Sequence, residues 1–171
     1  MRIDETIANC RRVIDSAHDA SLPVVYTRHM YRSGHIDAGI HSRERFETDL
    51  SGALLAGTWD VEVIDELRPT ASDHIVDEPR MDAFYNTSLE VLLRGLNARH
   101  LLVIGIVSNA CVETTTRSAA MRDFAVTVLE DCCTTFTKED QATTMNSLER
   151  FGFATVTSID FFISPVSPQV A

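Results

Sequence analysis

The stretch that decides the fold spans residues 100–122 and reads His-Leu-Leu-Val-Ile-Gly-Ile-Val-Ser-Asn-Ala-Cys-Val-Glu-Thr-Thr-Thr-Arg-Ser-Ala-Ala-Met-Arg. Its apolar run from Leu101 to Val107 predicts a strand that is buried on both faces, as in a parallel sheet. Ser108 and Asn109 interrupt this run, and apolar residues near helical spacing follow Cys111. The stretch therefore predicts a buried strand, a short turn that carries a cysteine, and a helix.

Cys111 is the first candidate for chemistry because it lies where the predicted helix begins. Unpaired backbone N–H groups at a helix N-terminus favour negative charge, so they lower the pKa of a thiol and can donate to an oxyanion. Open α/β sheets also bind their ligands at the carboxyl ends of strands. The alternative is a small, buried apolar cysteine without a chemical role. The residues alone leave both interpretations open.

Predicted strands and helices alternate along the chain, which indicates a parallel sheet with right-handed crossovers. We expect the α/β class, as a doubly wound and mostly parallel sheet flanked by helices in three layers, in one domain over residues 1–171. Residues 30–58 show no clear periodicity and predict a long loop that carries a short helix or covers a site. Besides the helix after Cys111, the expected helices span 4–20, 59–67 (a short helix or turn), 87–96 and 138–151, and the expected strands span 23–27, 74–77, 101–107, 125–130 and 154–158.

The composition limits the class of protein. The chain has 171 residues, with 25 acidic and 15 basic side chains and a net charge of −10. Because no basic cluster offsets this charge, binding to a nucleic-acid backbone is disfavoured. No apolar run is long enough to span a bilayer, and the N-terminus lacks the layout of a signal peptide. We therefore expect a cytoplasmic protein without nucleic-acid or membrane partners.

The four cysteines, Cys10, Cys111, Cys132 and Cys133, form no CxxC pair, and the histidines form no HExxH cluster. We expect the adjacent Cys132 and Cys133 to stay reduced, because disulfides between neighbouring residues are strained. The sequence thus predicts no metal site and no cofactor.

Four blocks of sequence point to one family. They are Gly57-Thr-Trp-Asp-Val-Glu-Val-Ile-Asp-Glu-Leu-Arg-Pro69, Pro79-Arg-Met-Asp-Ala-Phe-Tyr-Asn-Thr-Ser-Leu89, Gly105-Ile-Val-Ser-Asn-Ala-Cys-Val-Glu-Thr-Thr-Thr-Arg117 and Val128-Leu-Glu-Asp131. In this order and spacing they resemble the isochorismatase-like cysteine hydrolases, which include nicotinamidases, N-carbamoylsarcosine amidohydrolases and ureidoacrylate amidohydrolases. Two runs, 86–89 and 111–115, are most similar to the ureidoacrylate and carbamoyl amidohydrolases. The resemblance implies a small-molecule substrate and a homo-oligomer.

Active members of this family use an aspartate, a lysine and a cysteine, and only the cysteine carries over, as Cys111. The lysine position falls on Glu78. The aspartate would lie upstream of Met1, on a first strand, so the resemblance implies a domain that is incomplete at its N-terminus. In the family mechanism the thiolate attacks an amide or ureido carbonyl, the amine leaves, and water hydrolyses the thioacyl enzyme.

The turn around Cys111 is the expected oxyanion site. The resemblance assigns the oxyanion to the backbone N–H groups of Ala110 and Cys111, in a turn shaped by Val107 and Ser108. A cis peptide bond is common in this turn of the family, and it corresponds here to the bond between Val107 and Ser108.

Glu78 reverses the charge that the family places beside its cysteine. A carboxylate next to Cys111 would raise the pKa of the thiol. Glu78 could instead be protonated or serve as a base, or it could be a solvated loop residue that points elsewhere. The sequence leaves these alternatives open.

Further residues are candidates for substrate binding. Arg28 and the adjacent His29 follow the predicted strand 23–27 at its carboxyl end and could bind a substrate carboxylate, with a solvated strand end as the alternative. Asn109 lies in the turn that carries the cysteine. Trp59 and Phe84 match pocket walls by resemblance, with core packing as the alternative.

We expect an enzyme, a cysteine amidohydrolase that cleaves a C–N bond of a small amide, carbamoyl or ureido substrate through a thioacyl intermediate on Cys111. The alternative is a catalytically weakened member of the family that acts as a binding or assembly subunit. Metal-binding nicotinamidases carry Asp-x-His after the strand that ends near Arg28, whereas this chain has Arg28-His-Met-Tyr31. This difference again predicts no metal.

Overall fold

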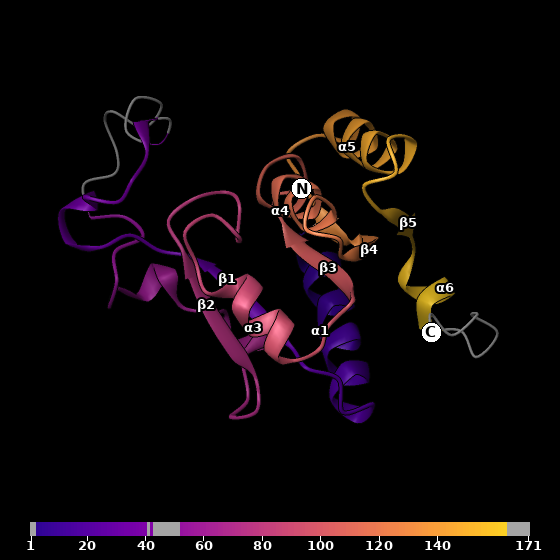
Figure 1. The fold of residues 1–171 in the computed structure, drawn as a ribbon, viewed down its shortest axis with the longest axis horizontal. Helices are drawn as coiled ribbons and strands as arrows, with labels where there is room; N and C mark the ends of the chain where they lie inside the picture. The colour runs from indigo at the N-terminus through magenta and orange to yellow at the C-terminus, as the bar shows by residue number, and fades with distance from the viewer. Residues whose placement is uncertain (1–2, 41, 43–51, 164–171) are drawn as a thin grey trace.

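The computed structural model describes residues 3–40, 42 and 52–163 of the chain (Figure 1). Helices and strands alternate, so the predicted α/β class is confirmed. The strands are β1 (Val25–His29), β2 (His74–Glu78), β3 (His100–Ile106), β4 (Ala125–Thr134) and β5 (Thr155–Thr157). The helices are α1 (Ile3–Asp19), α3 (Leu89–Gly95), α4 (Glu113–Ala120), α5 (Lys138–Arg150) and α6 (Ile159–Ile163). Short 3-10 turns occupy Ser33–His35, Trp59–Val61 and Asp65–Leu67, and a π-helical turn occupies Ser108–Val112.

Every strand pair is parallel, as predicted, but the described strands form two ladders rather than one. β1 pairs with β2, and β4 lies between β3 and β5. The register of the first ladder sets His29 opposite Glu78 at the ends of β1 and β2. In the second ladder the register of β3 and β4 shifts between Val103 and Gly105. In the described part of the chain, helices and loops therefore connect the two ladders.

Different helices cover the two faces of the second ladder. Val128 of β4 belongs to a core cluster that includes residues of α3, α4 and α5, among them Leu148. The next residue, Leu129, packs on the other face with Cys10 of α1 and Ile159 of α6. Because successive side chains of a strand point to opposite faces, this alternation gives the doubly wound arrangement. In Figure 1 helix α1 passes behind β3.

Some element boundaries differ from the prediction. β1 begins at Val25 instead of Pro23, because proline has no N–H to donate to a ladder. β4 runs to Thr134 rather than to residue 130, because Thr134 pairs with Ile106 beyond the register shift. The adjacent cysteines therefore lie inside β4, and their thiols are free, as predicted. Helix α6 was not predicted.

Helix α4 is fastened to the segment that follows β2. The Thr115 hydroxyl accepts the N–H of Ala83 at 3.1 Å and donates to the carbonyl of Met81 at 3.4 Å. The Ser118 hydroxyl donates to the Asp82 carboxylate at 2.8 Å. These bonds join the two ladders, because β2 belongs to the first ladder and α4 follows β3 of the second.

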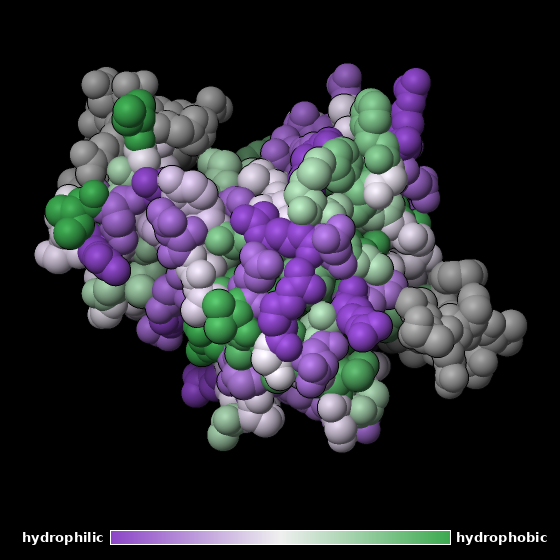
Figure 2. All heavy atoms as spheres, in the orientation of Figure 1, coloured by the Kyte–Doolittle hydropathy of each residue, from purple (hydrophilic) through white to green (hydrophobic). Residues whose placement is uncertain are grey.

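Polar side chains dominate the visible surface. Figure 2 shows hydrophilic side chains spread over one face of the molecule, with apolar side chains between them. Exposed apolar side chains that are scattered in this way are normal on protein surfaces. Within residues 3–40, 42 and 52–163, no helix combines the length and apolar character needed to cross a membrane.

Replacing Thr115 with valine removes both of its hydrogen bonds and leaves the N–H of Ala83 without this partner. An unsatisfied, partly buried donor costs about 1–3 kcal/mol, so we expect Thr115→Val to lower the free energy of unfolding by that amount in urea titrations. Thr114→Val is the matched control, because Thr114 is exposed on the same helix and its change should stay within about 0.5 kcal/mol. Equal stability of the two variants would contradict the role of Thr115.

Candidate active site

Cys111, Glu78 and His29 come together at the carboxyl ends of three strands. The thiol sulfur, a carboxylate oxygen and a ring nitrogen of these residues all lie within 4.8 Å of one another. His29 and Glu78 end β1 and β2, and Cys111 lies in the π-helical turn that follows β3. The carboxyl ends of strands are where an open α/β sheet is expected to bind its ligands. We call these three residues the strand-end cluster.

Strand alternation decides which residue of β1 joins the strand-end cluster. Arg28 and its ladder partner Asp77 form an ion pair at 2.7 Å, and Arg28 also meets Glu62 at 3.3 Å. The next pair along the ladder, His29 and Glu78, points to the opposite face. The structure therefore brings His29 into the cluster and holds Arg28 between two carboxylates. The period of two along β1 is the signal that could have identified His29 from the sequence.

A chain of hydrogen bonds holds His29 in one orientation. Its Nε2 lies 2.8 Å from the hydroxyl of Tyr31, and this hydroxyl donates to Ser42 Oγ at 3.1 Å. Because the hydroxyl hydrogen points to Ser42, the oxygen of Tyr31 accepts from Nε2–H, and Nδ1 keeps its lone pair. Burial, and after it the charge of Arg80, lower the pKa of His29 against a backbone hydrogen bond with Arg80 that raises it, and the net shift favours the neutral ring.

The turn after β3 begins one residue earlier than predicted. The cis peptide bond joins Ile106 to Val107, not Val107 to Ser108, because β3 already ends at Ile106. The Val107 carbonyl accepts the N–H groups of Ala110 at 3.1 Å and of Val112 at 3.3 Å. The N–H of Ala110, an expected oxyanion donor, is therefore engaged within the turn.

The other expected site residues lie outside the strand-end cluster. Phe84 is buried and packs against Phe124, with ring centroids 5.9 Å apart. Trp59 is 86 % exposed on its 3-10 turn. Asn109 accepts the hydroxyl of Thr135 through Oδ1 at 2.6 Å, which ties the cysteine turn to the segment after β4.

The thiol of Cys111 is harder to ionise than a free cysteine. Burial, and after it the charge of Glu78, raise the pKa of Cys111 to about 11, against backbone hydrogen bonds from Val107 and Cys111 that lower it. The position before a helix predicted a lowered pKa. The structure reverses this sign because burial outweighs the backbone N–H groups.

The carboxyl group of Glu78 is also strongly perturbed. Glu78 is only 3 % exposed, so its interpretation as a solvated loop residue is wrong. Burial, helped by the charge of Asp82, raises the pKa of Glu78 to about 7. Near neutral pH the strand-end cluster therefore combines a protonated thiol with a carboxyl group that is close to half ionised.

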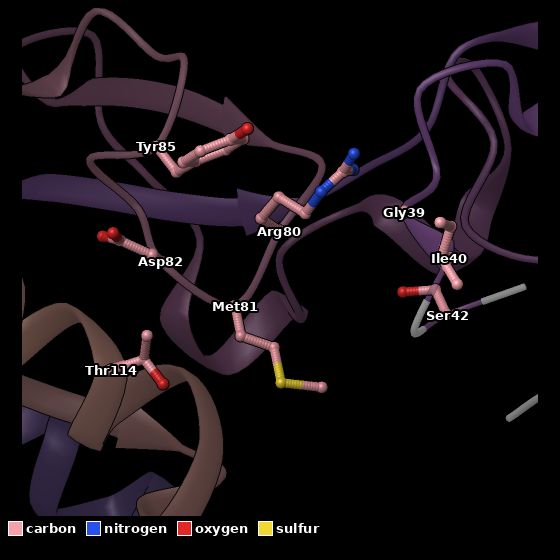
Figure 3. A pocket seen from close by; sticks show the side chains of 8 residues that line it. All are labelled: Gly39, Ile40, Ser42, Arg80, Met81, Asp82, Tyr85 and Thr114. Atoms are coloured by element: carbon pink, nitrogen blue, oxygen red, sulfur yellow. The ribbon is translucent and has the colours of Figure 1, made fainter.

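A cavity of about 550 Å³ is lined in part by residues that follow Glu78 and Cys111 in the chain, although no residue of the strand-end cluster lines it (Figure 3). The guanidinium of Arg80 donates to the backbone carbonyls of Asp37 and Pro79, which fixes it at the cavity wall. Figure 3 shows Arg80 reaching toward Gly39, with Met81 extending away from Thr114. The full lining is Gly39, Ile40, Ser42, Arg80, Met81, Asp82, Tyr85 and Thr114.

A family model described as the isochorismatase domain matches residues 1–160 of the chain. The chain belongs to the isochorismatase family. It is 33% identical to the ureidoacrylate amidohydrolase RutB of Rhizobium rhizogenes, over 97% of this chain and 74% of that protein. It is also 33% identical to RutB of Acinetobacter baylyi, over 74% of this chain but only 57% of that protein. The match thus spans little more than half the length of the Acinetobacter relative.

Solved structures of isochorismatase-family proteins have the same fold. The family member from Desulfovibrio vulgaris superposes with a TM-score of 0.86 at 25% identity, over 92% of this chain and 82% of that one. N-carbamoylsarcosine amidase from Thermoplasma acidophilum superposes with a TM-score of 0.76 at 26% identity, over 91% of this chain and 83% of that one. The predicted isochorismatase-like architecture is therefore confirmed.

Glu78 makes the stability of this family member depend on pH. The folded state holds the Glu78 proton more tightly than the unfolded chain, in which the carboxyl group has its ordinary pKa of 4.5. Its contribution to stability is therefore complete below about pH 4.5 and is lost as the pH rises through about 7. Because one pKa unit corresponds to about 1.4 kcal/mol, we expect a loss of about 3 kcal/mol.

Glu78→Gln removes this loss because glutamine does not ionise. In urea titrations between about pH 4 and pH 8, the unsubstituted protein should lose about 3 kcal/mol more of its free energy of unfolding than Glu78→Gln does. If the difference in free energy of unfolding between the two proteins stays constant with pH, the shifted pKa of Glu78 is contradicted.

Cys111 should be the first cysteine to react with iodoacetamide, because Cys10, Cys132 and Cys133 are at most 4 % exposed. Peptide mapping after brief labelling identifies the modified residue, and labelling in denaturant, where all four should react alike, is the control. The midpoint of the pH profile of Cys111 labelling should shift to lower pH in Glu78→Gln, because loss of the neighbouring charge lowers the pKa of the thiol. First labelling elsewhere, or an unshifted midpoint in Glu78→Gln, would refute this picture.

Proposed function

We propose that the protein hydrolyses a C–N bond of a small amide, carbamoyl or ureido substrate, with Cys111 as the nucleophile and Glu78 as its base. The observation that carries the proposal is the meeting of their thiol and carboxyl groups, within 4.8 Å, at the carboxyl ends of strands. Membership of the isochorismatase family supports it. The names ureidoacrylate amidohydrolase and N-carbamoylsarcosine amidase support it too, because both denote a carbonyl group bonded to nitrogen.

Glu78 accepts the proton of the thiol while the sulfur attacks. A thiol with a pKa of about 11 is protonated in the resting enzyme, so the attack needs a base at that moment. A carboxylate with a pKa of about 7 suits this role, because a general base works best when its pKa lies near the operating pH. In this mechanism the thiol loses its proton during the attack, whereas a neighbouring lysine would favour a thiolate already present in the resting enzyme.

The proposed steps balance in atoms and protons. The sulfur bonds to the carbonyl carbon, its proton passes to Glu78, and the carbonyl oxygen becomes an oxyanion. Glu78 then gives the proton to the leaving nitrogen, the C–N bond breaks, and a thioacyl group remains on Cys111. Water attacks the thioacyl carbon as Glu78 takes its proton. The C–S bond then breaks, Glu78 returns the proton to the sulfur, and the acid leaves.

The N–H of Cys111, which donates to the sulfur of its own residue before the reaction, is the donor that we favour for the oxyanion. The N–H of Ala110 already donates to the Val107 carbonyl at 3.1 Å, so it contributes only by sharing its hydrogen. Val107 and Ser108 serve by shaping the turn that aims these groups.

We infer that the substrate enters through the cavity of Figure 3, because Arg80 and Thr114 of its lining follow Glu78 and Cys111 closely in the chain. Among the described residues that line the cavity, Arg80 alone carries a positive charge, and backbone carbonyls hold its guanidinium in place. A guanidinium matches the geometry of a carboxylate. Arg80 is therefore better placed than Arg28 to bind an acidic substrate, because Arg28 is held by Asp77 and Glu62.

Turnover of primary amides, N-carbamoyl amino acids and ureido acids, measured in the presence of EDTA, tests the proposal. Cys111→Ser should abolish turnover. Glu78→Gln should lower kcat by about 10²–10⁴, the usual contribution of a general acid–base group. In the unsubstituted protein kcat/KM should rise as the pH passes through about 7, because the ionised carboxylate is the active form.

His74→Gln is the matched control, because His74 lies at the opposite end of β2 from Glu78. This variant should keep both the turnover and its pH profile. Turnover that survives Cys111→Ser would exclude the thiol as nucleophile. An unsubstituted protein that turns over nothing in the panel would favour the role of a binding or assembly subunit.

A further inference from the structure

The strand-end cluster of His29, Glu78 and Cys111 presents three different types of metal ligand. A ring nitrogen, a carboxylate oxygen and a thiol sulfur lie within 4.8 Å of one another. Ligand atoms around a tetrahedral zinc ion are about 3.3–3.7 Å apart, because their bonds to zinc measure about 2.0–2.3 Å. Side-chain movements of about 1 Å therefore bring all three atoms to one common ion.

Two of these side chains each have a buried polar atom without a hydrogen-bond partner. Glu78 is 3 % exposed, and its Oε2 has no hydrogen-bond partner in the part of the chain that the structure describes. Within the same residues, His29 Nδ1 is buried and has none either. Unpaired polar atoms in a protein interior are costly and call for an explanation. A cation bound between them would satisfy both atoms at once.

The hydrogen bonds behind His29 prepare its ring for a metal. Nε2–H donates to the hydroxyl of Tyr31, which in turn donates to Ser42 Oγ. The free lone pair is therefore on Nδ1, and neutral imidazole is the form that binds metals. Metal-bound histidines commonly donate their second N–H to an outer partner in this way.

We propose that His29, Glu78 and Cys111 bind one divalent ion of the zinc type. The bound ion prevents the thiol from acting as a nucleophile, an effect that we call silencing. A thiolate and an imidazole favour Zn²⁺ over Mg²⁺ and Ca²⁺, which prefer oxygen ligands. Three protein ligands leave the fourth tetrahedral position for water. The thiol releases its proton to solvent as the sulfur–metal bond forms, and no electron is transferred.

Metal binding and hydrolysis exclude each other in this cluster. A sulfur bound to the ion has given it the lone pair needed for attack, and a bound Glu78 no longer accepts a proton. The binding is independent of the proposed function, whereas the silencing rests on it. Sequence motifs did not reveal this site because its ligands lie far apart in the chain, at residues 29, 78 and 111.

Titration with Co²⁺ of the full chain, first stripped with EDTA, tests the binding without any substrate. We expect one equivalent of Co²⁺ to bind and give thiolate-to-cobalt charge-transfer absorption, which Zn²⁺ should abolish by displacement. Cys111→Ser should lose this absorption. Tyr31→Phe removes only the outer partner of His29 and should weaken Co²⁺ binding by about 10–100-fold. Glu78→Gln and His29→Asn each remove a ligand and should weaken it further.

His74→Gln is again the control and should bind Co²⁺ like the unsubstituted protein, and circular dichroism should show all variants folded. Cobalt that binds without charge-transfer absorption, or equally well to Cys111→Ser, would overturn the site. Turnover that persists with Zn²⁺ bound would overturn the silencing. Metal binding through Cys111 in a protein without turnover would support the site and count against the proposed function alone.

Discussion

A buried carboxyl group and a partly buried thiol compete for one negative charge at the strand ends. Burial raises the pKa of Glu78 to about 7 and that of Cys111 to about 11, and the charge of Glu78 contributes to the second value. Two negative charges within 4.8 Å in a poorly solvated space repel each other strongly. At moderate pH the carboxyl group therefore ionises alone. The protonation of the thiol follows from this competition, and so do the proposed role of a base and the proposed affinity for a cation.

Contacts between distant segments enforce this arrangement. The ladder of β1 and β2 holds His29 beside Glu78, but the described strands do not continue it to β3. The cysteine is brought to the pair because Thr115 and Ser118 of α4 bind the segment that follows β2. Sites that do chemistry commonly hold groups in costly surroundings when the fold around them is rigid. Here the rigid part is the connection between the two ladders.

Local patterns predicted more of this protein than long-range ones did. The apolar run 101–107 and the turn at Cys111 were identified correctly because both depend on neighbours in the sequence. Arg28 and His29 were both candidates, and alternation along β1 allows only one of them to face Glu78, but the choice between them depends on the register with β2. The burial of Glu78, and hence the sign of the pKa shift at the thiol, depends on packing that no periodicity encodes.

The ladder of β1 and β2 carries two successive pairs of a nitrogen base and an acid, Arg28 with Asp77 and His29 with Glu78, on opposite faces. Inserting one residue before Arg28 would exchange the faces of the two β1 side chains. A permanently charged guanidinium would then stand beside the thiol and favour its ionised form. Evolution could therefore change how this nucleophile is activated through a single insertion or deletion, with no new type of side chain.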